Sequence, residues 1–231
     1  MVEVIAYDSR GALARGLAGL VAGDLRAALA AEGTASLAVP GGTTPQPFLE
    51  ELATARLDWS SVTVIATDER WVPPDDPRSN EALIREALID ATGAAFLPFW
   101  RGDAMPEAAA GALGAALRPA APLSSAVLGM GLDMHCASLF PGMDGLEGAM
   151  DEQGEAMLQA LPSPIVTDGA VEMRLTLTAR MLSGAAHLRL LITGADKRAA
   201  LEAALAEDDP LRAPVGAILR RARAAEVHWA A

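Results

Sequence analysis

Residues 125–135 read SAVLGMGLDMH: a short apolar run, two glycines one residue apart, and an Asp-x-His triplet. The run Ser125–Leu128 has the length and composition of a buried strand, and the polar residues begin where it ends. In an open parallel sheet, ligands bind outside the carboxyl ends of the strands. This stretch therefore predicts a strand and a functional loop attached to its end.

The same order, an apolar run and then a polar or glycine-rich cluster, recurs along the chain. Ser36–Val39 precedes Pro40-Gly-Gly-Thr-Thr-Pro45, Val62–Thr67 precedes Asp68-Glu-Arg70, and Leu188–Thr193 precedes Gly194-Ala-Asp-Lys197. Further strands are expected at 2–6, 171–177 and 226–229. Helices are expected at about 9–31, from the turn at Pro40–Pro45 to about 53, from near 79 onward, at about 106–117, and from the Gly194–Lys197 cluster to 206. Strands that alternate with helices predict an α/β fold, a mostly parallel sheet sandwiched by α-helices.

Two segments have no regular pattern. Residues 68–74 are expected to form a polar loop, and residues 142–164 a long surface loop, with a mobile flap as the alternative for the latter. The sequence contains neither an internal repeat nor a low-complexity linker. We therefore expect a single domain over residues 1–231.

Composition restricts the class of protein. Hydrophobic residues make up 52% of the 231 residues, yet no apolar run approaches the roughly 18 residues of a membrane span. The net charge of −12 disfavours nucleic acid as a partner. A start without a basic segment (MVEVIAYDSR) and a lone cysteine, Cys136, are typical of a cytoplasmic protein. Oligomeric state stays open between monomer and homodimer.

The glycine pairs are candidate ligand loops. Gly41 and Gly42, followed by Thr43, allow close approach of an anion or of sugar hydroxyls; an ordinary tight turn with Thr44 as helix N-cap is the alternative. The second pair ends at Gly131. A dinucleotide-binding fingerprint needs glycine where Met134 stands, so a nicotinamide cofactor is disfavoured. Backbone N–H groups around Gly42 and Gly131 could instead receive a developing oxyanion.

Asp133 and His135 are the candidate catalytic pair. Imidazole can accept a proton from water, and a neighbouring carboxylate can hold its tautomer. A purely structural pair is the alternative. Cys136 is expected to be a buried small residue, and Ser138 does not lie in a Gly-x-Ser-x-Gly turn, which disfavours a thiol or serine nucleophile. The sequence has no cluster of metal-ligand spacing, so neither a metal nor an organic cofactor is expected.

Three basic residues are candidate phosphate ligands: Arg70, Arg174 and the only lysine of the chain, Lys197. Arginine binds phosphate bidentately and lysine acts as a compact charge. Glu69 could pair with Arg70 for structural reasons alone.

Taken together and in order, these motifs resemble the 6-phosphogluconolactonase family, which is related to the glucosamine-6-phosphate deaminases. The resemblance rests on Gly41–Pro45, on Asp68-Glu-Arg70 with Ser79-Asn80, on Leu128–Gly142, on Arg174–Thr178 and on Gly194–Lys197. It implies a Rossmann-like fold and hydrolysis of 6-phospho-D-glucono-1,5-lactone in the pentose phosphate pathway, with His135 activating water. Asp133 would hold the imidazole, and Gly41, Gly42, Thr43, Asp68, Arg70, Gly131, Arg174 and Lys197 would bind substrate and its phosphate.

The same motifs separate the two related activities. Deaminases usually have Asp-Glu-Tyr where this chain has Asp68-Glu-Arg70, and Phe-Asn-Glu-Pro where it has Ser138-Leu-Phe-Pro141. The deaminase reaction is thus the alternative, together with a sugar-phosphate-binding protein of impaired activity. The second alternative arises because the family has Asp-Gly-His where this chain has Met134. If that position requires positive φ, methionine is strained by about 1–2 kcal/mol.

Overall fold

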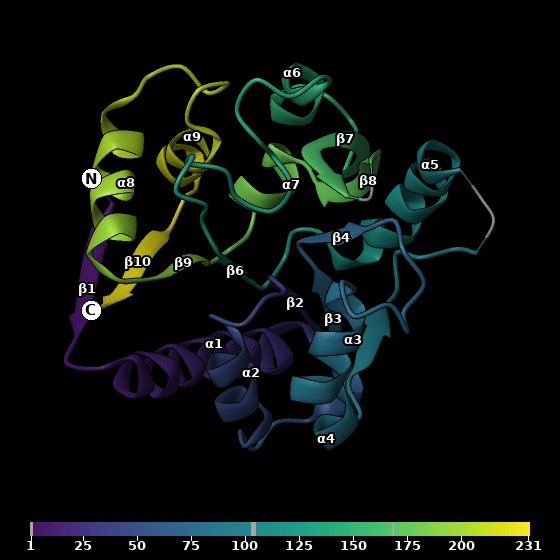
Figure 1. Cartoon of the computed structure of the whole chain (residues 1–231). Helices are drawn as coiled ribbons and strands as arrows, with labels where there is room; N and C mark the ends of the chain where they lie inside the picture. The colour runs from purple at the N-terminus through teal and green to yellow at the C-terminus, as the bar shows by residue number, and fades with distance from the viewer. Residues whose placement is uncertain (1, 103–104, 168) are drawn as a thin grey trace.

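The computed structural model describes residues 2–102, 105–167 and 169–231. Within these ranges a parallel sheet of seven strands forms the centre, in the order β1-β10-β9-β6-β2-β3-β5 (Figure 1). Its strands are β1 (Glu3–Tyr7), β2 (Ala35–Val39), β3 (Val62–Ala66), β5 (Ala95–Leu97), β6 (Ser125–Leu128), β9 (Leu188–Thr193) and β10 (Ala225–Ala230). The result confirms the predicted α/β class.

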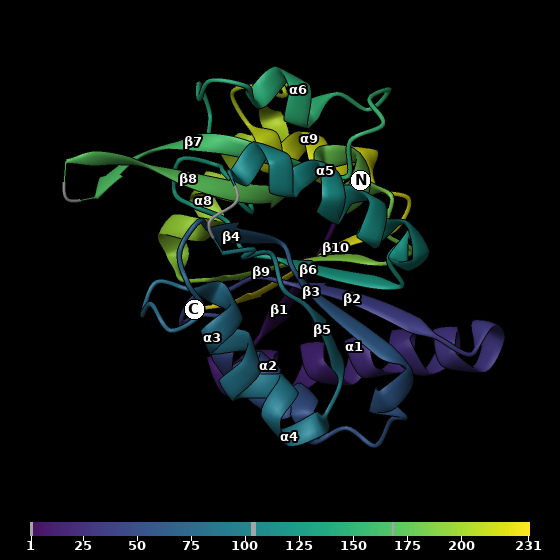
Figure 2. The ribbon, with the colours of Figure 1, turned by 90° about the vertical axis from the view of Figure 1, so that its right-hand side faces the viewer.

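Helices cover both faces of this sheet (Figure 2). One face carries α1 (Arg10–Glu32), α2 (Gln46–Ala53) and a helix built from α3 (Asn80–Ile84), a π-helical turn (Arg85–Ile89) and α4 (Asp90–Thr92). The other face carries α5 (Pro106–Leu117), α6 (Leu146–Met150), α7 (Ala179–Ser183), α8 (Ala195–Ala206) and α9 (Pro214–Arg221). No helix within the described ranges has both the length and the apolar character needed to span a bilayer.

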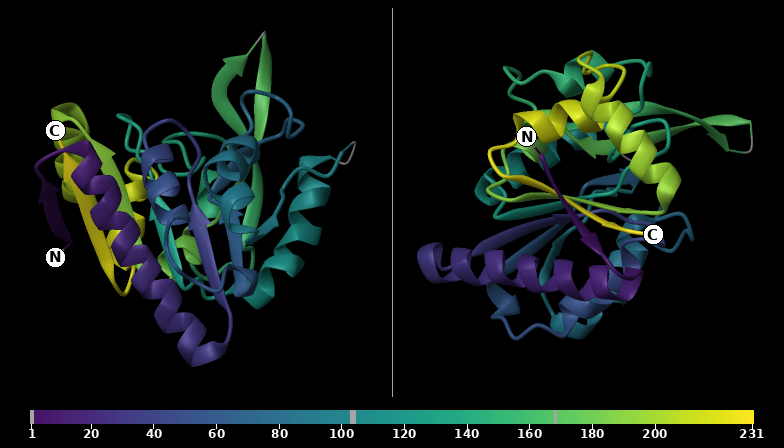
Figure 3. Two further views of the ribbon diagram at one scale, coloured as in Figure 1. Left: turned by 90° about the horizontal axis from the view of Figure 1, so that it is seen from below. Right: turned by 90° about the vertical axis from the view of Figure 1, so that its left-hand side faces the viewer.

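A small antiparallel sheet lies on the same side as α5 to α9, in the order β4-β8-β7. Its strands are β4 (Asp68–Arg70), β7 (Leu158–Thr167) and β8 (Ala170–Leu177). Figure 3 shows the β7–β8 hairpin projecting from the body of the molecule. One continuous hydrophobic core includes residues of both sheets, among them Leu37 of β2 and Leu175 of β8.

Local sequence explains the longest helix well. The Ser9 hydroxyl accepts a hydrogen bond from Ala12 N (3.2 Å) and caps the start of α1. Gly33 ends the helix in a left-handed conformation with φ of 76°. Between these residues Leu17, Val21 and Leu25 recur at helical spacing and are fully buried against the sheet.

Three local expectations are wrong. The segment 142–164 is not one long loop, because it contains α6 and the first part of β7. Asp68–Arg70 forms β4, because β8 passes beside it and supplies hydrogen-bond partners that are distant in sequence. Thr44 does not cap α2; Pro45 takes the N-cap position, without a side-chain hydrogen bond.

Strand order determines where a ligand can bind. From β2 the sheet continues through β3 to β5 on one side, whereas on the other side β2 pairs with β6 and then β9 follows. The connections that leave β2 and β6 therefore diverge, which opens a crevice at the carboxyl ends of these two neighbouring strands. The Pro40–Pro45 loop follows β2 and the Gly129–His135 loop follows β6.

Candidate active site

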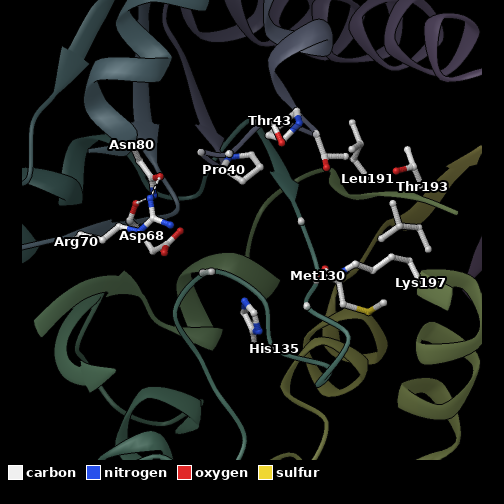
Figure 4. Close-up of a pocket in the computed structure, with 18 of the residues that line it drawn as sticks. Pro40, Thr43, Asp68, Arg70, Asn80, Met130, His135, Leu191, Thr193 and Lys197 are labelled. Atoms are coloured by element: carbon white, nitrogen blue, oxygen red, sulfur yellow. Dashed lines mark hydrogen bonds between the residues drawn. The ribbon is translucent and has the colours of Figure 1, made fainter. Parts of the chain in front are cut away.

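A cleft of about 320 Å³ occupies this crevice (Figure 4). It is lined by Pro40, Gly41, Gly42, Thr43, Thr44, Pro45, Asp68, Arg70, Asn80, Gly129, Met130, Gly131, His135, Ala137, Arg174, Leu191, Ile192, Thr193 and Lys197. Every site residue expected from the sequence is in this set except Asp133, which contacts the cleft through His135. The structure thus brings together side chains that lie more than a hundred positions apart.

His135 and Asp133 form a hydrogen-bonded pair in this cleft. Nδ1 of His135 lies 2.6 Å from Oδ1 of Asp133. A carboxylate can only accept, so in the neutral imidazole Nδ1 carries the proton and Nε2 has the free lone pair. The imidazole ring also packs on Phe140, with 4.1 Å between ring centroids. These contacts orient the only ring nitrogen that is able to take a proton.

The loop that carries this pair is fastened at several points. Gly131 N donates to His135 O (2.9 Å), and Met134 N donates to Gly131 O (3.2 Å), which closes a tight turn. Met134 O accepts a hydrogen bond from Val215 N (3.3 Å), in the first turn of α9. The turn therefore has little freedom to carry His135 away from the cleft.

Met134 adopts a left-handed backbone conformation, with φ of 69°. Glycine occupies this conformation freely, whereas a residue with a Cβ is strained there by about 1–2 kcal/mol. Met134 is half-buried and packs against the hydrophobic core. The side chains of Asp133 and His135, on either side of Met134, are nevertheless within hydrogen-bond distance of each other.

Arg70 reaches the cleft from the end of β4. Its Nη1 donates to Asn80 Oδ1 (2.9 Å) and to the carbonyl oxygen of Arg78 (2.7 Å). Arg70 Nε is buried and has no hydrogen-bond partner among the described residues. Both partners of Nη1 are neutral oxygens, and no acid among the described residues forms an ion pair with this guanidinium.

Arg174 lies on β8, opposite Arg70 in the β4–β8 register. Unlike Arg70, it is paired with acids: Nη2 donates to Glu172 Oε2 (2.6 Å), and Nη1 lies 3.9 Å from Asp68 Oδ2. Its guanidinium also lies over the ring of Phe140, 5.6 Å from the centroid. Phe140 therefore contacts both a cation of the cleft and the imidazole of His135.

Lys197 comes from the first turn of α8. Its Nζ donates to the carbonyl oxygen of Met130 (2.5 Å) and so ties α8 to the loop after β6. Burial lowers the pKa of Lys197, and the nearby Asp133 carboxylate opposes that shift. Figure 4 places Lys197 and Arg70 on opposite sides of the cleft, with His135 between and below them.

The turn after β2 supplies backbone donors. Gly42 has φ of 96°, a conformation that glycine adopts without strain. In the part of the chain that the structure describes, no hydrogen-bond partner is found for the N–H groups of Gly42 and Thr43. Such free N–H groups ahead of a helix form a cradle for a negatively charged oxygen.

Comparison with known proteins identifies the group to which this architecture belongs. Residues 8–229 match the model of the family described as glucosamine-6-phosphate isomerases/6-phosphogluconolactonase. The chain belongs to this family. It is 43% identical to the 6-phosphogluconolactonase of Rhizobium meliloti (strain 1021), an alignment that covers 97% of each chain. It is also 43% identical to the 6-phosphogluconolactonase of Pseudomonas aeruginosa, over 96% of this chain and 92% of the relative.

A solved structure agrees with these sequence relationships. The crystal structure of a 6-phosphogluconolactonase from Shewanella baltica OS155 superposes with a TM-score of 0.93 at 32% identity, and covers 100% of this chain and 98% of the other. The resemblance to the 6-phosphogluconolactonase family that the motifs indicated is thereby confirmed.

Two details of this family member differ from expectation. Glu69 does not pair with the Arg70 guanidinium; its carboxylate accepts from the backbone N–H groups of Arg70, Asn80 and Glu81 and from the Ser79 hydroxyl. Burial raises the pKa of Glu69, and these hydrogen bonds oppose that shift. The expected oxyanion donor Gly131 is also unsuitable, because its N–H already donates to His135 O.

Sequence reasoning missed one residue that lines the cleft. Asn80 is buried and contacts both Arg70 and the backbone of Asp68. The sequence points to it only as part of the Ser79-Asn80 motif. The one available signal is its identity, because Asn80 is the only asparagine in the chain. It lies at the start of a helix that Ser79 already caps, so capping does not explain a second polar residue there.

Proposed function

We propose that this chain hydrolyses 6-phospho-D-glucono-1,5-lactone to 6-phosphogluconate, the activity that its relatives' names state, and that the His135–Asp133 pair is the catalytic centre. The observation that carries the assignment of the centre is the 2.6 Å contact between the two side chains within a cleft that also holds three cations. The deaminase reaction is not favoured, since the curated relatives reported above are 6-phosphogluconolactonases.

His135 acts as general base in this reaction. A water molecule attacks the lactone carbonyl carbon while Nε2 of His135 takes one of its protons. The tetrahedral intermediate then collapses, the bond from the carbonyl carbon to the ring oxygen breaks, and the imidazolium returns the proton to that oxygen. Asp133 stabilises the imidazolium that forms between these two steps.

The cleft also has donors for the charge that develops on the carbonyl oxygen. We assign this role to the N–H groups of Gly42 and Thr43, because the N–H of Gly131 is occupied within its own loop. Arg70, Arg174 and Lys197 supply the positive charge that holds the 6-phosphate, with Gly41 and Asp68 completing the wall. A net charge of −12 repels a phosphorylated substrate, so these local cations are needed for binding.

A lactone-opening assay tests the function directly. The purified protein is incubated with 6-phosphoglucono-1,5-lactone and acid release is compared with the spontaneous rate, with a His135→Asn variant as the matched control. We expect acceleration by the native protein and loss of it in the variant. Ammonia release from glucosamine 6-phosphate, with no acceleration of lactone opening, would assign the deaminase reaction instead.

The remaining expectations are part of the same proposal. We propose that residues 1–231 form one such domain, supported by the family match over 8–229, and that it acts in the cytoplasm on a small phosphorylated sugar rather than on nucleic acid. We also propose that the protein is a monomer or a homodimer. Light scattering on the purified protein distinguishes these two states.

A further inference from the structure

The Asn80 side chain lies between two walls of the cleft that come from different sheets: Arg70 on β4 of the small sheet, and the turn after β2 of the large sheet. On one side, its Oδ1 accepts from Arg70 Nη1 (2.9 Å). Its Nδ2 donates to Asp68 O (2.8 Å), which fixes the amide in one orientation. The amide is buried, with 3% of the residue exposed, and both of its polar atoms are used within the site.

On its other side, Asn80 touches the turn after β2. A Cβ added to Gly41 would come within 1.9 Å of Asn80 Oδ1 and 2.3 Å of Asn80 Cγ. The φ of Gly41 is not positive, so its backbone conformation is open to other residues. Glycine is therefore required here because the Asn80 amide occupies the space that a side chain would need.

The backbone of Asn80 is fixed as well. Its N–H donates to Glu69 Oε1 (2.8 Å), and Glu81 N donates to Glu69 Oε2 (2.7 Å). The buried carboxylate of Glu69, which lies on β4, thus joins this strand to the start of α3 through hydrogen bonds. The Asn80 side chain is therefore attached to a rigid helix start and not to a free loop, so it can fix the positions of the groups that it contacts.

The hydrogen bonds of Arg70 show what this arrangement does. Both of its side-chain hydrogen bonds to described residues come from Nη1, and Nε is buried, which leaves Nη2 without a partner among the described residues. Nη2 is therefore the guanidinium nitrogen that can donate a charge-assisted hydrogen bond to a phosphate oxygen. Without Asn80, the guanidinium would keep only the Arg78 carbonyl as a fixed partner among the described residues.

We propose that Asn80 is a positioning residue that holds the Arg70 guanidinium and the Gly41 turn in one arrangement, and that this arrangement sets the preference for a phosphorylated over an unphosphorylated ligand. The proposal rests on the proposed function for the identity of the ligand. Asn80 does not bind the substrate in this scheme; it acts through Arg70 and through Gly41.

A double-mutant cycle in binding tests the connection to Arg70. Native protein, Asn80→Ala, Arg70→Ala and the double variant are titrated by calorimetry with 6-phosphogluconate and with gluconate. Asn80→Ala is expected to weaken 6-phosphogluconate binding about 10-fold, as for loss of a hydrogen bond to a charged group, and to change gluconate binding less than about 2-fold. In the Arg70→Ala background the same substitution should have an effect below about 2-fold.

A second cycle tests the contact with Gly41. Gly41→Ala in the native background should weaken 6-phosphogluconate binding about 10-fold, because the new methyl group displaces the amide. Asn80→Ala would keep Cβ, which lies 2.8 Å from the added methyl group, so the second background is Asn80→Gly, in which Oδ1, Cγ and Cβ are all absent. Relative to Asn80→Gly alone, the added effect of Gly41→Ala should fall below about 3-fold. If the role of Asn80 were purely structural, the effect of Gly41→Ala on 6-phosphogluconate binding would not become smaller when the Asn80 side chain is removed.

Stability is checked separately by thermal unfolding of each variant. Arg85→Ala is the matched control, since it removes the ion pair between the partly exposed Arg85 and the buried Glu81 from the same helix without touching Arg70. Equal losses for the two ligands, or full additivity in either cycle, would overturn the proposal. So would a native protein that binds 6-phosphogluconate no better than gluconate.

Failure of the proposed lactonase function can be distinguished from failure of the proposal for Asn80. If the native protein binds 6-phosphogluconate preferentially but does not accelerate lactone opening, the lactonase proposal fails. The binding cycles still decide the role of Asn80 in that case, because they do not depend on turnover.

Discussion

Nδ1 of His135 lies 2.6 Å from Oδ1 of Asp133, and both atoms occupy space beside the Cα atom of Gly131. A Cβ at position 131 would come within 2.1 Å of Nδ1 and 2.2 Å of Oδ1. The φ of Gly131 is not positive, so the glycine is explained by this close approach and not by its backbone conformation. The pair and the glycine therefore form one unit, whose parts can be tested separately.

Replacing His135 by Asn should lower kcat on the phosphorylated lactone by about 100-fold or more, with KM nearly unchanged. A general base contributes roughly this factor, and it acts on the transition state rather than on binding. Steady-state kinetics against the spontaneous rate measures the effect. Near-native turnover in the variant would remove His135 from the mechanism.

Gly131→Ala should lower kcat about as strongly as loss of the base, because the new methyl group must push the Asp133–His135 pair out of position. Gly114→Ala is the control for a change from glycine to alanine as such, since Gly114 lies in α5 with open space around its Cα. It should retain full activity. If Gly131→Ala were as active as this control, the space argument would be wrong.

At position 134 glycine should give a more stable protein than alanine, the reverse of the usual order of stability. Both Met134→Ala and Met134→Gly remove the same packed side chain, so their difference reports the backbone at φ of 69°. We expect the glycine variant to be more stable by about 1 kcal/mol, the left-handed strain less the greater entropy of glycine in the unfolded chain. Urea unfolding with equal slopes measures this difference. An alanine variant at least as stable would show that no strain is present.

Acid should destabilise the protein through His228. This side chain is buried on β10, with its Nδ1 2.9 Å from the Tyr7 hydroxyl. Burial lowers the pKa of His228 to about 4, Arg189 adds to that effect, and Glu226 opposes it. An unfolded histidine binds its proton near pH 6.5, so between about 6.5 and 4 the unfolded chain binds more protons than the native one.

The free energy of unfolding therefore decreases as the pH falls through this window, and His228 contributes up to about 1.4 kcal/mol per pH unit. His228→Gln should give a flatter dependence of stability on pH between about 6.5 and 4. Urea unfolding at a series of pH values checks the slope. Identical slopes in the two proteins would contradict the assignment to His228.

The sequence alone determined the elements whose signals are local. The helix at 106–117, the strands at 125–128 and 188–193 and the end of the helix at 206 agree with the structure to the residue. Each follows from hydrophobic period, apolar run length or a residue such as Pro106 at a helix start, and these act over a few neighbours. The order of motifs along the chain was enough to indicate the family.

Only the tertiary structure decided the contacts between distant segments. Asp68–Arg70 is a strand because β8 runs beside it, and Gly41 is a glycine because Asn80 fills the space next to it. Whether the N–H of Gly131 could serve an oxyanion depended on how its loop closes on His135. Such facts depend on the path of the chain across the sheet, and sequence periodicity carries no information on which distant side chains meet there.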